Sequence, residues 1–181
     1  DQLSSLSTVK AVYPDVIHHA QMDASLDLIG SVETWEQLGG KENAGAGVKV
    51  AIIDSGIRPQ NPLFSGENFE APPADTLPTD DYCSEVPDFC NNKLIVARAA
   101  DIVEGFAVVE EEYESPLGFN GHGTHVAGTA VGNYGVMAER DGAEAEISGV
   151  APAAYLMVYK GLYATPANPA SSSGASSMLL S

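Results

Sequence analysis

The chain has 181 residues, of which 44% are hydrophobic, and its formal net charge is −17. This length and composition suffice for one sizeable hydrophobic core and predict roughly one domain. No run of about 18 apolar residues occurs, so the sequence predicts no transmembrane helix. Residues 67–114 hold thirteen acidic residues against Lys93 and Arg98. We interpret this run as a solvated acidic surface, whose sign disfavours binding to nucleic acid.

The first forty residues are predicted to form two separate segments. The opening stretch, DQLSSLSTVK, lacks the basic and then apolar layout of a signal peptide. A short helix and a strand are expected within the first twenty residues, with a joint near Ala20 to Asp23. Residues 24–40, ASLDLIGSVETWEQLGG, predict an amphipathic helix that ends at Gly39 and Gly40.

Two strands are predicted in the next part of the chain. Residues 48–57, VKVAIIDSGI, are a continuous apolar run rich in valine and isoleucine, which is typical of a buried strand in a parallel sheet. Asp54 stands at the carboxyl end of this strand. The proline-rich residues 59–92 predict a loop, and residues 92–100, NKLIVARAA, predict a second strand.

The chain has two cysteines, Cys83 and Cys90, in DYCSEVPDFCNNK. An even count at close spacing favours a disulfide and an oxidising compartment. Two unpaired thiols in a cytosolic protein are the alternative. The C-x6-C spacing is not typical of a metal site, and no D-x-D-x-D-G calcium loop accompanies the acidic residues.

The second half of the chain continues the alternation of strand and helix. Residues 124–133, THVAGTAVGN, predict a short helix of small residues, and residues 146–163, EISGVAPAAYLMVYKGLY, predict a turn and then a strand. Residues 164–177 predict a loop of proline, serine and glycine. The order strand, loop, strand, helix, strand is typical of an α/β fold with a parallel sheet. Ligands of open parallel sheets bind outside the carboxyl ends of the strands, where Asp54 is expected.

Asp54 and His122 are the candidate catalytic pair. An aspartate that accepts a hydrogen bond from one imidazole nitrogen fixes the tautomer and leaves the other nitrogen free as a base. Gly121 and Gly123 would let backbone and substrate pass close to the ring. Each residue alone has a plainer interpretation, since an aspartate after a strand often forms a turn and a single histidine is often structural. A metal site at His122 and His125 lacks a third ligand at suitable spacing.

The motifs VAIIDSGI (50–57) and GHGTHVAG (121–128) resemble the aspartate and histidine motifs of the subtilisin-like serine peptidases, the subtilases. Residues 149–160, GVAPAAYLMVYK, resemble the strand that follows the histidine helix in that family. The resemblance covers roughly residues 24–163 and implies a subtilisin-like parallel sheet with flanking helices. It also implies that Asp54 is the orienting aspartate and His122 the general base.

The segment around the cysteines resembles the insertion of the larger subtilases, including plant-type enzymes. Residues 1–21 resemble the end of an inhibitory propeptide, and residues 22–181 resemble the N-terminal part of the peptidase domain. The resemblance therefore implies secretion, polypeptide substrates, the protein's own propeptide as a partner, and processing between about His19 and Ala24. No cofactor is required for the implied chemistry. Structural calcium is common in the family, but no position here matches a site.

The resemblance ends before the catalytic serine. In the family the nucleophile lies in a later Gly-Thr-Ser-Met-Ala motif, and SGASSM (173–178) is not such a motif, so we interpret Ser176 and Ser177 as part of a loop and a short helix. Asn133 and Asn168 do not match the oxyanion asparagine.

The sequence thus predicts the front fragment of a secreted serine endopeptidase that uses a Ser-His-Asp triad. A non-enzymatic binding or inhibitory module is the alternative. The 181 residues alone are expected to be inactive, with an uncovered apolar sheet face.

Overall fold

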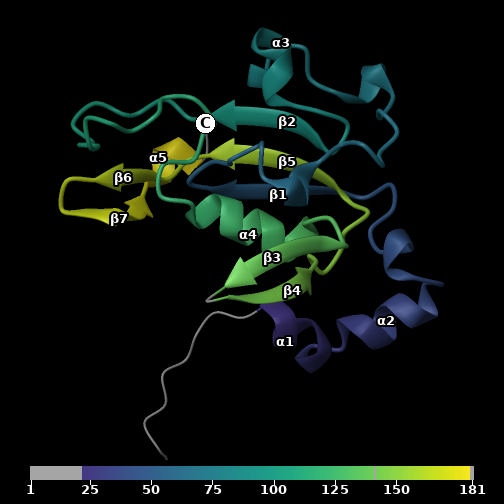
Figure 1. The fold of residues 1–181 in the computed structure, drawn as a ribbon. Helices are drawn as coiled ribbons and strands as arrows, with labels where there is room; N and C mark the ends of the chain where they lie inside the picture. Colours follow the sequence, from purple (N-terminus) through teal and green to yellow (C-terminus); the bar gives the residue numbers. More distant parts are fainter. Residues whose placement is uncertain (1–21, 141, 180–181) are drawn as a thin grey trace, which may run out of the picture.

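The computed structural model describes residues 22–140 and 142–179, so the expected propeptide segment, residues 1–21, lies outside the described part (Figure 1). The strands are β1 Lys49–Asp54, β2 Leu94–Ala99, β3 Val136–Arg140, β4 Ala143–Ile147, β5 Tyr155–Lys160, β6 Tyr163–Thr165 and β7 Asn168–Ser173. The α-helices are α1 Met22–Leu28, α2 Ser31–Gln37, α3 Tyr82–Glu85, α4 His122–Val131 and α5 Ser176–Leu179. Short 3₁₀ helices are η2 Lys41–Asn43, η3 Pro62–Phe64, η4 Ala74–Thr76 and η5 Pro87–Phe89.

A three-stranded parallel sheet organises the molecule. The strand order is β1-β5-β2, so the last of these strands in the sequence lies between the other two. The three arrowheads point the same way in Figure 1, and the β6–β7 hairpin lies beyond that carboxyl edge. The predicted α/β class, with a parallel sheet and flanking helices, is confirmed. Both predicted strands and the strand after the histidine helix are present, although each is shorter than its predicted range.

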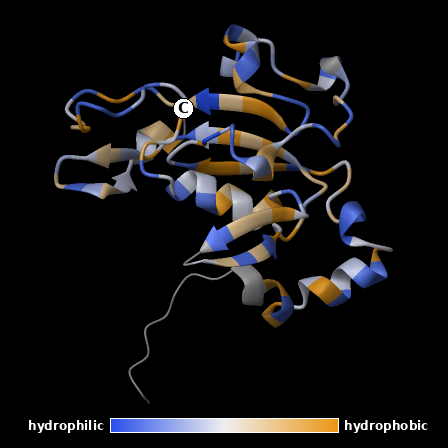
Figure 2. Cartoon of the chain, in the orientation of Figure 1, coloured by the Kyte–Doolittle hydropathy of each residue, from blue (hydrophilic) through white to orange (hydrophobic). Residues whose placement is uncertain are grey.

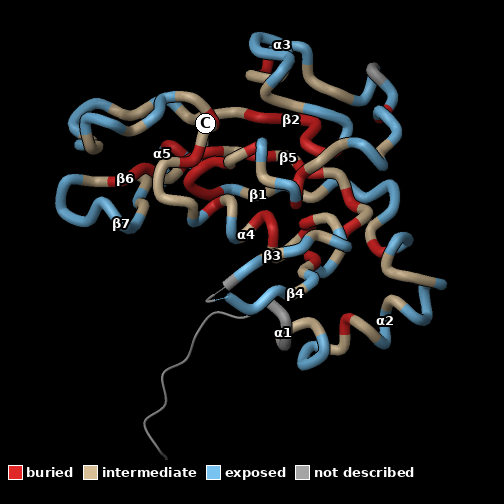
Figure 3. Tube along the Cα trace, viewed as in Figure 1, coloured by how far each residue is buried: buried red, intermediate tan, exposed pale blue. Residues whose placement is uncertain are grey.

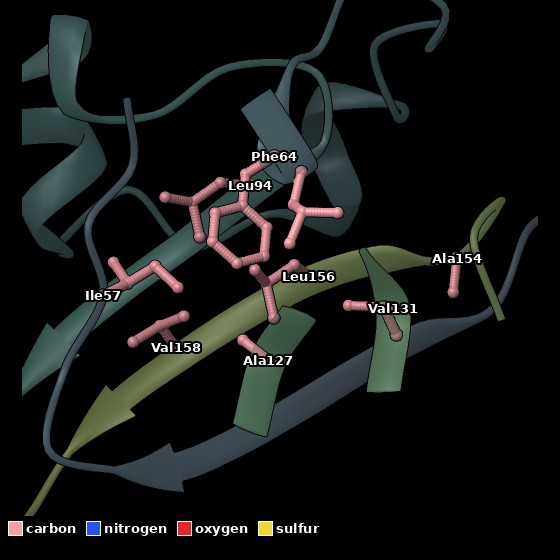
Figure 4. Close-up of a cluster of buried hydrophobic side chains, with 9 residues drawn as sticks. Ile57, Phe64, Leu94, Ala127, Val131, Ala154, Leu156 and Val158 are labelled. Atoms are coloured by element: carbon pink, nitrogen blue, oxygen red, sulfur yellow. The ribbon is translucent and has the colours of Figure 1, made fainter. Parts of the chain in front are cut away.

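Helix α4 covers one face of this sheet and closes the core. Its residues Ala127 and Val131 pack against Leu156 and Val158 of β5, together with Phe64 from the loop after β1 (Figure 4). These side chains are almost fully buried. Because side chains alternate between the two faces of a strand, burying Leu156 and Val158 directs their neighbours to the opposite face.

That opposite face has little cover over β1. Ile53 is 57% exposed there, and Lys49 and Ala51 of the same face are exposed. Met157 and Tyr159 of β5, which belong to the same face, are half-buried. The central residues of both strands are apolar, as Figure 2 shows, while Figure 3 shows buried segments on β2, β5 and α4. The predicted uncovered apolar face is therefore present along β1.

The segment that was predicted as one amphipathic helix forms two. Helix α1 ends at Leu28, and α2 begins at Ser31 after Gly30, whose φ of 74° lies in the left-handed region. A left-handed residue cannot continue an α-helix, so the chain turns there. The prediction of a single helix over residues 24–40 is wrong because it treated this glycine as an interior residue.

Two antiparallel hairpins were not predicted. The β3–β4 pair precedes β5, and the β6–β7 pair occupies most of the stretch that was expected to be a loop. Strand β7 reads NPASSS, which has little intrinsic preference for strand. Its pairing with β6 is a tertiary outcome that composition alone does not indicate.

The expected disulfide between Cys83 and Cys90 is present, and it links α3 to the turn after η5. The buried carboxylate of Asp81 attaches this insertion to the sheet. Asp81 accepts hydrogen bonds from the Ser84 backbone and from the Ala97 backbone of β2. The interpretation of residues 67–114 as a solvated acidic surface is therefore wrong at Asp81, which is only 3% exposed. Among the described residues, no helix is long and apolar enough to cross a membrane.

Candidate active site

Asp54 and His122 meet at the carboxyl edge of the sheet. Asp54 is the last residue of β1, and its side chain is 11% exposed. His122 is the first residue of α4, after Gly121 in a left-handed conformation with a φ of 84°. The His122 Nδ1 and the Asp54 Oδ1 are 2.7 Å apart. The hydrogen bond that the sequence predicted is present, and it joins residues 68 positions apart in the chain.

The Asp54 carboxylate is also held by the backbone of its own turn. Its Oδ1 also accepts a hydrogen bond of 2.7 Å from the backbone N–H of Ser55. This geometry orients the carboxylate within the turn that follows β1. The His122 side chain is 63% exposed. Within the described part of the chain, no side chain other than that of Asp54 hydrogen-bonds the ring. The arrangement therefore holds the imidazole at Nδ1 and leaves the other nitrogen available as a base.

Ser55 and Asn120 tie the start of α4 to the end of β1. The Ser55 hydroxyl donates to Asn120 Oδ1 at 3.2 Å and accepts from the Gly123 backbone N–H at 3.0 Å. The same Asn120 oxygen accepts from the His122 backbone N–H, also at 3.2 Å. The Asn120 amide donates to the Ser172 hydroxyl of β7 at 2.7 Å. One amide thus connects the β6–β7 hairpin to the first turn of the histidine helix.

Thr124 holds the loop after β1. The sequence predicts that the helix starts at Thr124, but the helix begins two residues earlier, at His122. The Thr124 hydroxyl instead accepts a hydrogen bond of 2.9 Å from the Arg58 backbone N–H. The side chain therefore fixes the distance between α4 and the loop, which is a tertiary contact and not a helix cap.

The other residues discussed from the sequence lie apart from this hydrogen bond. His125 is exposed, one turn further along α4. Asn133 lies beyond the end of α4 and donates to the Ser65 carbonyl, and Asn168 opens β7. Ser176 lies in the short helix α5. Among described residues, no group of three or more histidine, cysteine, aspartate or glutamate side chains is arranged to hold a metal ion.

An aspartate at a strand end that hydrogen-bonds Nδ1 of a histidine at a helix start is the arrangement that serine hydrolases use to orient a general base. Comparison with known proteins agrees with that class. The family model described as the subtilase family matches residues 45–178. The chain therefore belongs to the subtilase family.

Several curated plant proteins are similar to this chain. Subtilisin-like protease SBT2.2 of Arabidopsis thaliana is 40% identical over 141 residues, which cover 71% of this chain and 16% of that protein. Subtilisin-like protease SBT2.1 of the same plant is 33% identical over 172 residues, covering 90% of this chain and 21% of that protein. Subtilisin-like protease SBT3.9 is also 33% identical, over 88% of this chain and 22% of its own length. The chain thus spans about a fifth of the length of these relatives.

Sequence reasoning did not single out Ser55 and Asn120. A signal was available, because Ser55 follows the candidate aspartate directly and Asn120 precedes the candidate histidine by two residues. Short polar side chains next to a helix start often hydrogen-bond its backbone. The partners of these two residues, 65 positions apart, are visible only in the folded chain.

Proposed function

We propose that the full-length protein is a secreted serine endopeptidase that hydrolyses peptide bonds in polypeptides through a Ser-His-Asp triad. His122 is the general base and Asp54 is the residue that orients it. The observation that carries this proposal is the 2.7 Å contact between His122 Nδ1 and Asp54 Oδ1, in a chain that belongs to the subtilase family.

In the proposed reaction, His122 removes the proton from a serine hydroxyl as the serine oxygen attacks the peptide carbonyl carbon. The imidazolium that forms is stabilised by the Asp54 carboxylate, and it then protonates the leaving amine. Water hydrolyses the acyl-enzyme in a second cycle of the same proton transfers. This chemistry needs no cofactor. We assign the serine and the oxyanion donor to parts of the protein outside residues 1–181, because no Gly-Thr-Ser motif occurs within them.

Secretion and processing belong to the same proposal. The Cys83–Cys90 disulfide supports an oxidising compartment, because disulfides are rare in the cytosol. We further propose that residues 1–21 are the end of an inhibitory propeptide, which makes the protein's own propeptide a partner. Cleavage is expected between about His19 and Ala24. N-terminal sequencing of the mature protein tests this boundary, and a start beyond Trp35 would show that it is misplaced.

The test of the catalytic assignment compares two histidines of one helix. The full-length protein is assayed on a fluorogenic peptide with and without a serine-directed inhibitor, alongside the variants His122→Ala and His125→Ala. We expect inhibitor-sensitive hydrolysis by the parent protein and by His125→Ala. Loss of the general base in subtilisin lowers turnover by about 10⁶-fold, and His122→Ala should fall by a similar order. A folded parent protein without inhibitor-sensitive hydrolysis would contradict the proposal and favour a non-enzymatic binding or inhibitory module.

A further inference from the structure

Lys160 is a buried cation whose ammonium group donates its hydrogen bonds to a single segment of the chain, residues 112–117. Its side chain is fully buried, and so is that of its ion-pair partner, Glu112. The Lys160 ammonium donates to Glu112 Oε1 at 2.9 Å, to the Tyr113 carbonyl at 2.6 Å and to the Leu117 carbonyl at 2.8 Å. An ammonium has three N–H donors, so the three contacts use all of them.

The residues that accept these hydrogen bonds belong to the loop that leads into His122. Leu117 lies five residues before His122 and forms a parallel bridge with Ile57, three residues after Asp54. The bridge consists of a hydrogen bond from the Ile57 N–H to the Pro116 carbonyl and one from the Gly118 N–H to the Ile57 carbonyl, both 2.9 Å long. The position of this loop therefore sets how the histidine segment lies against the aspartate segment.

The backbone that follows Lys160 holds the aspartate. Lys160 is the register partner of Asp54 on the neighbouring strand β5. The next two residues, Gly161 and Leu162, both donate their backbone N–H groups to the Asp54 carbonyl, at 3.0 and 3.2 Å. Lys160 thus lies beside Asp54 through its main chain, and its side chain hydrogen-bonds the loop that leads to His122.

We propose that Lys160, paired with Glu112, is the positioning residue of the catalytic pair and holds His122 at hydrogen-bond distance from Asp54. This inference rests on the proposed function for its catalytic meaning, while the geometry that it describes is a property of the chain itself. Neither residue touches the reacting atoms. Each acts through the loop that carries the histidine.

Glu112 extends the contact to the β6–β7 hairpin. Its Oε1 also accepts from the Tyr113 backbone N–H at 2.9 Å, and its Oε2 accepts from the Ala164 backbone N–H of β6 at 2.7 Å. The Lys160 ammonium lies 4.8 Å from the centre of the buried Tyr163 ring. Burial lowers the pKa of Lys160, and the hydrogen bond to Glu112 opposes that shift. Removing either charge leaves the other buried without its partner, which is far less favourable than removing both.

A second buried lysine offers a matched control. The Lys93 side chain is fully buried and donates to the carbonyls of Pro152 at 2.7 Å and Ala154 at 2.9 Å. Lys93 precedes β2, so it lies at the amino edge of the sheet, whereas Asp54 and His122 lie at the carboxyl edge. Replacing either lysine by methionine removes one buried ammonium group. Only Lys160→Met removes hydrogen bonds to the loop before His122.

The experiment uses the full-length protein and its variants Lys160→Met, Glu112→Gln and Lys93→Met. Two quantities are measured: the low-field proton resonance of the His122 Nδ1–H that is hydrogen-bonded to Asp54, and kcat and KM for a peptide substrate. Each variant is studied at the same interval below its own Tm, so that differences in stability do not enter. We expect Lys160→Met to lose or broaden the low-field resonance and to lower kcat by about 100-fold, with KM changed little, because displacements near 1 Å have effects of that order. Lys93→Met should keep both readouts.

Glu112→Gln decides the question if Lys160→Met does not fold. Glutamine retains one acceptor oxygen where the structure uses two, so the loop is loosened, and a fall in kcat of about 10-fold with a broadened resonance is expected. A parent-like resonance and kcat in both variants at the Lys160–Glu112 pair would overturn the inference. Equal losses in Lys93→Met would overturn it as well, since they would mark a general effect of buried lysines. If the parent protein is not a peptidase, the proposed function fails, yet the resonance comparison still decides whether Lys160 positions the pair.

Discussion

Gly123 of α4 lies directly against Gly56 in the turn after β1. A Cβ built on Gly123 would be 2.3 Å from the Gly56 carbonyl oxygen and 3.2 Å from Asp54 Oδ1. Only a residue without a side chain allows the first turn of the helix to approach the aspartate strand this closely. The sequence predicts that Gly123 leaves room for both backbone and substrate to pass close to the imidazole ring. The structure shows that its own contact is with the backbone next to Asp54.

The first prediction concerns this close approach. Gly123→Ala should push the start of α4 away from β1 and lengthen the contact between His122 and Asp54. Overpacking of this kind costs about 1–3 kcal/mol of unfolding free energy. Peptidase turnover should fall about 100-fold or more, because a small displacement of a catalytic group is sufficient for that loss. Denaturant unfolding and steady-state kinetics of the full-length protein measure the two effects.

A glycine with open space around it serves as the control for this substitution. Gly135 has a φ of 73°, and a Cβ there would meet nothing within 4 Å. Gly135→Ala should cost about 1 kcal/mol through backbone strain and leave kcat unchanged. Equal kinetic losses in both variants would show that the Gly56–Gly123 contact has no special role.

The second prediction separates the role of the Asp54 charge from its burial. Asp54→Asn keeps the shape of the side chain but presents an amide to His122 Nδ1, which favours the wrong imidazole tautomer. In a serine peptidase such a change lowers kcat by about 10⁴-fold with the geometry retained. Asp81→Asn is the matched control, because Asp81 is also a buried carboxylate that accepts backbone N–H groups. Asp81→Asn should lower Tm but leave kcat unchanged. An Asp54→Asn variant with the parent's kcat would show that Asp54 has no role in the mechanism.

The third prediction concerns pH and Lys93. Burial lowers the pKa of Lys93 from 10.5 to about 7. Between these values the unfolded chain binds more protons than the folded one, so the free energy of unfolding must rise with pH. The rise from this group is up to about 1.4 kcal/mol per pH unit above pH 7, and it is absent at lower pH, where both states are protonated.

Comparison with a variant that lacks Lys93 separates the contribution of this lysine to the free energy of unfolding from that of the other titrating groups. The free energy of unfolding of the parent protein, minus that of Lys93→Met, is measured at several values between pH 6 and pH 10. We expect the difference to be flat up to about pH 7 and to increase above it in favour of the parent protein. A difference that does not change over the whole range would mean that the folded protein keeps Lys93 protonated.

The fourth prediction concerns the disulfide. The double variant Cys83→Ser/Cys90→Ser should be less stable by about 2–3 kcal/mol, because the bond closes a short loop in the unfolded chain. Protease resistance should fall first in the segment around α3 and η5, while kcat stays near the parent value. Thiol titration of the unreduced, secreted protein should find no free thiol from these residues. Two reactive thiols there would also weaken the proposed extracellular location.

The fifth prediction concerns residues 1–181 expressed alone. The face of β1 that includes Ile53 is open, so this chain should bind a hydrophobic dye, associate, and unfold with low cooperativity. It should show no inhibitor-sensitive peptide hydrolysis, because His122 has no serine of the family motif to activate. Inhibitor-sensitive turnover by a cooperatively folding monomer would mean that Ser176 or Ser177 had been wrongly dismissed.

The sequence by itself determined the elements whose signal is local. The valine- and isoleucine-rich run before Asp54 predicts β1, because strands of parallel sheets are apolar along their length, although one face of β1 is exposed here and the strand is not fully buried. The glycines around His122 and the spacing of the two cysteines are likewise visible in single short segments. The family motifs then paired Asp54 with His122, and the structure contains that hydrogen bond.

Only the tertiary structure decided which charged residues are buried. Asp81 and Glu112 belong to an acidic run that we interpreted as solvated, yet both are buried, each with partners supplied by distant segments. Composition cannot reveal this, because the transfer of a carboxylate from water is offset only by donors placed around it in three dimensions. Lys160 is such a donor for Glu112, 48 residues away.

Local pattern also failed where the backbone depends on a distant contact. Residues 168–173, NPASSS, form a strand because they pair with β6. The Thr124 hydroxyl accepts a hydrogen bond from the Arg58 backbone because α4 lies against the loop that contains Arg58. Gly30 divides the predicted helix because a left-handed φ is accessible to glycine at little cost, and sequence alone does not say which glycine adopts it. The sequence thus named Asp54 and His122, whereas the contacts of Ser55 and Asn120 and the distances within the site are products of the fold.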